Sequence, residues 1–229
     1  MNLSPDGIVY WHVGPLALNA TIVFTWAVML VLSLGAWLIT RGLDASLAPS
    51  RWQLLLEALV TAMRDQIQEI GHESAGRYLP FIGTLFLYIA AANLLAIVPG
   101  FEPPTGSLST TTALAIAVLV AVPLYGVTEH GPRAYLAHYV EPTVFMLPFN
   151  IVGEISRTLA LAVRLYGNIM SGTLIVAILM GLTPFFVPIA MQALGIVTGI
   201  VQAYIFAVLA MVYIASATAV HARRDPSTD

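Results

Sequence analysis

Hydrophobic residues fill four long stretches of the chain that no charged side chain interrupts. These stretches cover residues 7–40, 78–101, 103–128 and 165–222. Each is longer than the roughly 20 apolar residues that a helix needs to cross the hydrocarbon core of a bilayer. The first three stretches predict spanning helices at about 16–40, 78–98 and 107–128.

The C-terminal part of the chain is apolar almost to Ala219 and is interrupted near Pro184. It predicts two further helices at about 143–182 and 184–219, which at 1.5 Å per residue are roughly 50 to 60 Å long. Because the hydrocarbon core is only about 30 Å thick, these helices cannot both stand upright in it. We expect a hairpin of two long, strongly tilted helices.

A different pattern lies between the first two spans. Apolar residues recur at helical spacing over about 50–71, with polar and charged residues between them. This pattern indicates an amphipathic helix on the membrane surface or against a partner subunit. The sequence therefore predicts an all-α integral membrane protein with about five membrane helices and one interfacial helix, in a single membrane domain over residues 1–229.

Composition narrows the classes of function. Hydrophobic residues make up 59% of the 229 residues and charged residues 9%, and the mean hydropathy is +0.86. Soluble proteins have about a quarter charged residues, so a soluble globular enzyme is excluded. A net charge of -3 offers no broad cationic surface for nucleic acid. The absence of Cys excludes disulfides and thiolate metal sites, and no cofactor is expected.

The basic residues are distributed unevenly about the predicted spans. All nine are Arg, and those in alternate loops or the C-terminal tail are Arg41, Arg51, Arg64, Arg77, Arg133, Arg223 and Arg224. Basic loops face the cytoplasm, so we expect the N-terminus outside and the C-terminus in the cytoplasm. The first span follows Asp6 rather than a basic leader, so we expect it to be retained.

The fourth predicted helix contains the charged residues Glu154, Arg157 and Arg164. An Arg near the bilayer centre costs at least about 2.5 to 3.5 kcal/mol. Glu154 lies one turn before Arg157, which favours an ion pair within the helix. Arg164 has no acid within reach along its own helix, so we expect its counter-charge on another chain. The alternative is an Arg that backbone carbonyls and water hold as part of the packing.

Two uncharged polar residues lie at membrane depth as well. Asn168 follows Arg164 by four residues, and Gln202 is isolated in the last predicted helix. Each could form a hydrogen bond between helices or take part in transport, and the residue types leave both roles open. Small residues along the fourth helix would let another helix approach closely, namely Gly153, Ala160, Ala162, Gly167, Ser171 and Gly172.

Two blocks of sequence, residues 159–172 with Arg-Leu-Tyr-Gly-Asn at their centre and residues 201–209, closely resemble the signature blocks of subunit a of the F-type ATP synthase. The resemblance runs nearly end to end and includes residues 11–14, 93–100 and 109–115. It implies a stator with two half-channels for protons, in a bacterial inner (plasma) membrane. The implied partners are a ring of c subunits that each carry an ion-binding carboxylate, peripheral-stalk b subunits, other ATP synthase subunits and the lipid bilayer.

The resemblance also implies roles for single residues. Arg164 matches the essential Arg of the family, and Asn168 and Gln202 match polar residues that line the ion path. Glu154 corresponds to an acid that many relatives carry near this point and is the candidate half-channel group, while Arg157 stands where relatives often have Lys. The fixed charge of Arg164 would favour the ionised form of a passing carboxylate and repel cations.

The chain departs from the family pattern at Thr173 and Gly195. Many relatives carry an acid or His and a complementary partner at these two positions. Their absence puts the usual outer relay in doubt and keeps a sodium-coupled version open beside the proton-coupled one.

The alternative function is a stand-alone secondary transporter whose midplane Arg binds an anionic substrate. That class predicts inverted repeats with helices broken at matching positions, and the sequence contains no such internal repeat. A hydrolase that uses Ser171 would need a base, and the His residues all lie outside the predicted spans. We therefore expect a non-catalytic subunit with no active site of its own.

Overall fold

The computed structural model describes residues 6, 9–13, 16–41, 51–71, 75–98, 100–132, 146–182 and 186–218. Its helices are α1 (Ala20–Thr40), α2 (Arg51–Gly71), α3 (Ala75–Leu95), α4 (Leu108–His130), α6 (Met146–Leu182) and α7 (Phe186–Thr218). In this described part, five helices, all but α2, are long and apolar enough to cross a membrane. The expected all-α membrane fold is therefore confirmed.

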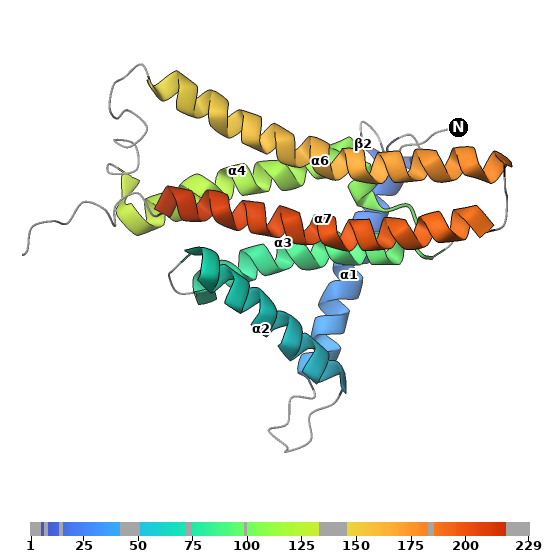
Figure 1. The fold of residues 1–229 in the computed structure, drawn as a ribbon, viewed down its shortest axis with the longest axis horizontal. Helices are drawn as coiled ribbons and strands as arrows, with labels where there is room; N and C mark the ends of the chain where they lie inside the picture. The colour runs from blue at the N-terminus through green and yellow to red at the C-terminus, as the bar shows by residue number, and fades with distance from the viewer. Residues whose placement is uncertain are drawn as a thin grey trace, which may run out of the picture.

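The long helices do not all run in the same direction. Figure 1 shows α3, α4, α6 and α7 alongside one another, while α1 crosses their direction steeply. With 21 residues, α1 is about 31 Å long, so it matches a hydrocarbon core of about 30 Å when it stands near the membrane normal. The other four helices are then steeply tilted, and this tilt fits the 37 residues of α6 and the 33 residues of α7 into the same core.

The core of the protein lies where α3, α4, α6 and α7 meet. Phe206 of α7, Ile89 of α3 and Leu165 of α6 are fully buried there. Ala203 and Ala210 of α7 are fully buried as well, and such small side chains let the neighbouring helices approach closely. Close approach matters because packed helices in a bilayer gain little from burying apolar surface that lipid already covers.

The hydrophobic pattern predicted that the first membrane helix begins near residue 16, but the helix begins at Ala20. Strand β2 (Leu16–Asn19) precedes it and pairs antiparallel with strand β1 (Val9–Val13). The backbone groups of these residues therefore bond to a neighbouring strand instead of extending the helix. A short apolar run fits a strand as well as a helix, so periodicity could not separate the two.

Local signals account for both ends of α4. A short 3-10 helix, η2 (Pro104–Gly106), turns the chain before it. The side chain of Ser107 then caps α4 by accepting a hydrogen bond from the backbone N–H of Ser109 at 3.2 Å. At the other end, Gly131 adopts a φ of 82° and donates its N–H to the carbonyl of Val127, which is a conformation that favours glycine.

The amphipathic helix that the sequence predicts over about 50–71 corresponds to α2. Its buried residue Ile67 packs into the core, whereas Glu57 and Arg64 are exposed. Helix α2 lies against α3 and α7. One side of α2 thus contacts the membrane helices of its own chain. The two expected locations of its other side, the membrane surface or a partner subunit, stay predictions.

Candidate functional site

Arg164 lies in the most closely packed part of α6 and still reaches the surface. Its neighbours Leu161, Ala162 and Leu165 are 2%, 3% and 0% exposed, whereas Arg164 itself is exposed. Among the residues that the structure describes, none forms an ion pair or hydrogen bond with its guanidinium. At membrane depth this charge costs at least about 2.5 to 3.5 kcal/mol unless another molecule compensates it.

Small side chains surround Arg164 on the exposed face of α6. Ala160, Gly167 and Ser171 are exposed within two turns of it. A β-carbon added at Gly167 would meet nothing within 4 Å, and Leu159 nearby is 62% exposed. The face is therefore an apolar surface with a cation in it, and a second helix could approach this surface closely.

Gln202 of α7 has the opposite environment. Its side chain is only 5% exposed, and its Nε2 is buried with no hydrogen-bond partner in the part of the chain that the structure describes. An unpaired buried amide costs about 1 to 3 kcal/mol. The hydrogen bond between helices, one of the two roles expected for Gln202, is therefore not formed through Nε2.

The hairpin of α6 and α7 brings Asn168 and Gln202 to about the same level. The guanidinium of Arg157 lies 5.7 Å from the ring centre of Tyr213, which fixes how the two antiparallel helices are aligned. Eleven residues further along α6 is Asn168, and eleven residues back along α7 is Gln202. Both helices rise about 1.5 Å per residue, so the two residues lie at about one level of the hairpin, and Asn168 is one turn from Arg164.

The sequence favours an ion pair between Glu154 and Arg157, and this pair stays a prediction. An ion pair is formed between Arg77 and Glu129, at 2.6 Å. Arg157 is exposed and lies over the ring of Tyr213, within the distance at which a cation is attracted to an aromatic face. Arg157 therefore makes a contact across the hairpin that sequence spacing did not predict, and Glu154 is half-buried one turn away.

The positions that depart from the family pattern carry no ionisable side chain here. Thr173 is exposed, and its hydroxyl donates to the backbone carbonyl of Met170 in its own helix at 2.9 Å. At Gly195 an added β-carbon would meet nothing within 4 Å. Neither position approaches the level of Asn168 and Gln202.

A polar cluster that sequence analysis missed lies beside η2. The carboxylate of Asp6 accepts hydrogen bonds from the hydroxyls of Thr21 at 2.7 Å, Ser107 at 2.6 Å and Ser109 at 3.1 Å. The hydroxyl of Thr105 in η2 is fully buried and has no partner among the described residues. The Ser- and Thr-rich sequence around the turn was a signal for this cluster, but its partner Asp6 is a hundred residues away.

Helix η2 also brings this cluster close to α6. A β-carbon at Gly106 would lie 3.3 Å from the side chain of Ile169, which is the residue after Asn168. Polar side chains near η2 therefore lie next to the part of α6 that holds Asn168 and Arg164.

The sequence as a whole matches known proteins along nearly its full length. Residues 22–215 match the family model described as ATP synthase A chain. The chain is 62% identical over 218 residues to ATP synthase subunit a of Albidiferax ferrireducens, covering 95% of this chain and 94% of the relative. It is 59% identical to ATP synthase subunit a 2 of Acaryochloris marina, with 96% and 94% covered. It is also 59% identical to ATP synthase subunit a 1 of Chlorobaculum parvum, with 95% and 96% covered.

Proposed function

The chain belongs to the ATP synthase subunit a family, and from this premise we propose that it is the stator of a rotary membrane sector that moves protons past a ring of c subunits. The observation that carries the proposal is Arg164, an exposed cation at membrane depth with no partner among the described residues. Such a charge needs a counter-charge that another chain supplies. Besides the c ring, the proposed partners are peripheral-stalk b subunits and other ATP synthase subunits.

Arg164 would act on a carboxylate that each c subunit carries past it. Two opposite unit charges 4 Å apart attract by about 4 kcal/mol at an effective dielectric constant of 20. This attraction is comparable with the cost of holding an Arg near the bilayer centre, so the attraction can offset that cost. The attraction favours the ionised carboxylate, which releases its proton. The same charge repels cations and so prevents a direct leak between two half-channels.

Asn168 and Gln202 are proposed to line the ion path beside Arg164. Their amide groups lie at one level of the hairpin, and the buried Nε2 of Gln202 is a donor without a partner among the described residues. A buried polar group of this kind is commonly satisfied by a water molecule, and water is also what a proton path requires. Glu154 and Arg157, closer to the start of α6, are proposed to belong to the half-channel on that side.

We place the N-terminus outside and the C-terminus in the cytoplasm of a bacterium, with the protein in the inner (plasma) membrane. The distribution of Arg residues supports this orientation. The ion pair between Arg77 and Glu129 joins the start of α3 to the end of α4 and so holds these two ends on one side of the bundle. Both residues then lie at the cytoplasmic surface.

The decisive experiment is ATP-driven acidification of vesicles that contain the assembled complex. We expect Arg164→Ala to abolish pumping while the complex still assembles, because the rotor carboxylate loses its counter-charge. Arg64→Ala is the control, since Arg64 is an exposed cation on α2 and belongs to neither helix of the hairpin. Undiminished pumping by Arg164→Ala would contradict the proposal. ATP-driven uptake of sodium instead of protons would leave the stator role intact and change the ion.

A further inference from the structure

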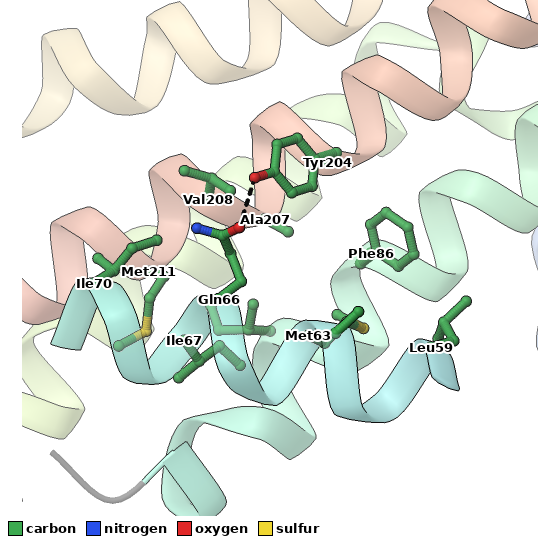
Figure 2. A pocket seen from close by; sticks show the side chains of 12 residues that line it. Leu59, Met63, Gln66, Ile67, Ile70, Phe86, Tyr204, Ala207, Val208 and Met211 are labelled. Carbon is green, nitrogen blue, oxygen red and sulfur yellow. Dashed lines mark hydrogen bonds between the residues drawn. The ribbon is translucent and has the colours of Figure 1, made fainter. Parts of the chain in front are cut away.

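A cavity of about 330 Å³ lies between α2, α3 and α7. Figure 2 shows side chains from the three helices around it. The apolar residues that form most of its wall include Leu59, Met63 and Ile67 of α2, Phe86 of α3, and Val208 and Met211 of α7. The cavity is partly open at its rim.

The cavity is separate from the ion path. Met211 follows Gln202 by nine residues, and at about 100° per residue this places the two side chains on opposite sides of α7. One side of α7 thus carries the amide of Gln202. The other side forms the wall of the cavity.

The cavity wall carries two polar side chains, and they bond to each other. They are the amide of Gln66 and the hydroxyl of Tyr204, which donates to Oε1 of Gln66 at 2.9 Å. Figure 2 shows this bond at the cavity. A buried water needs two to four polar partners, and the remaining wall offers aliphatic and aromatic groups only. The chemistry of the wall therefore fits hydrocarbon better than water.

The surroundings of the cavity supply hydrocarbon. Helices α3 and α7, which form two of its walls, are membrane-spanning helices. Two of its three walls therefore belong to the membrane-spanning part of the protein, and its rim is partly open. A volume of 330 Å³ has room for roughly ten methylene groups if each occupies about the ~30 Å³ share of a water molecule.

We propose that the cavity binds one acyl chain of a membrane phospholipid. The acyl chain fills the cavity between α2, α3 and α7 and contacts Met63, Phe86 and Met211, where close packing gains dispersion energy. In this position it holds the amphipathic α2 against the membrane helices. The site depends on the membrane location of the protein and not on its ion path, so either proposal can fail alone.

The test labels the assembled complex, in vesicles, with a phospholipid that carries a photoreactive diazirine in its acyl chain. We expect labelled peptides from α2 that contain Met63. Ala62 lines the cavity, so Ala62→Trp should fill it and remove this labelling. Ala58 is exposed on the same helix and does not line the cavity, so Ala58→Trp should leave the labelling unchanged. Equal labelling in both variants would overturn the proposal.

A second measurement does not require Ala62→Trp to fold. The chain has no Cys, so Met63→Cys introduces a single thiol into the cavity wall. A nitroxide attached there should collide readily with oxygen, which concentrates in lipid, and poorly with a water-soluble nickel complex. The same label at exposed Glu57 is the control and should meet the nickel complex readily. Preferential contact with nickel at residue 63 would show a water-filled cavity and overturn the proposal.

Discussion

Asn93 of α3 lies directly against the backbone of Gly199 in α7. Its Nδ2 donates to the carbonyl of Ile89 at 2.8 Å and to that of Gly199 at 3.4 Å. A β-carbon at residue 199 would lie 2.7 Å from Cγ of Asn93. Because Gly199 is one turn before Gln202, this contact sets the height of Gln202 relative to α3.

We expect Gly199→Ala to destabilise the protein and reduce pumping. The added methyl group would force the buried side chain of Asn93 away from its two carbonyl partners. Overpacking of this kind typically costs about 1 to 3 kcal/mol, and it would also shift Gln202. The measurement is the thermal inactivation of ATP-driven pumping.

The matched control for that substitution is Gly195→Ala, one turn earlier in α7. A β-carbon there meets nothing within 4 Å, and Ala favours a helix over Gly by up to about 1 kcal/mol. We expect unchanged or slightly higher stability. Similar losses for both variants would show that the Asn93 contact is not the cause.

Arg164→Lys should lose most pumping although it keeps the positive charge. Lysine lacks the planar fork that binds a carboxylate through two hydrogen bonds, and its ammonium group is more strongly hydrated. Arg157→Lys is the comparison, because an ammonium group can still lie over the ring of Tyr213. We expect a mild effect there in the same vesicle assay. Equal activity of the two variants would contradict a geometric role for Arg164.

The sequence predicted the membrane helices well because charged and turn-forming residues mark their ends. It also made Arg164 a candidate site residue for a physical reason, since a guanidinium cannot lose its charge and no acid lies nearby on its helix. It could not predict that Arg157 lies over Tyr213 or that Asn168 is level with Gln202. Both depend on the alignment of two helices, which hydrophobic periodicity does not specify.

The alignment of the hairpin predicts a crosslink between residues 168 and 202. In this Cys-free chain, Asn168→Cys combined with Gln202→Cys should react with a bifunctional thiol reagent that spans the 8 to 10 Å between packed helices. Asn168→Cys combined with Leu209→Cys is the control, because Leu209 is about two turns further along α7. The crosslinked fraction is measured on a denaturing gel. A stronger crosslink to residue 209 would mean that the hairpin is aligned differently.

The Asp6 cluster escaped sequence analysis because its parts are distant in the chain. The carboxylate of Asp6, three residues before β1, bonds to Thr21 at the start of α1 and to Ser107 at the cap of α4. No local pattern indicates such a contact. Each hydrogen bond to a charged group contributes about 1.5 to 3 kcal/mol when it is well buried, and less in this partly exposed cluster.

We therefore expect Asp6→Ala to lower the thermal stability of the assembled complex, and Asp6→Asn to lower it less because the amide oxygen still accepts a hydrogen bond. Ser107→Ala removes the cap of α4 as well, which costs about 1 kcal/mol by itself. The stability loss of the double variant should be smaller than the sum of the losses of the two single variants, since both remove the same hydrogen bond. Fully additive losses would mean that Asp6 and Ser107 stabilise the protein independently, contrary to the 2.6 Å contact between them.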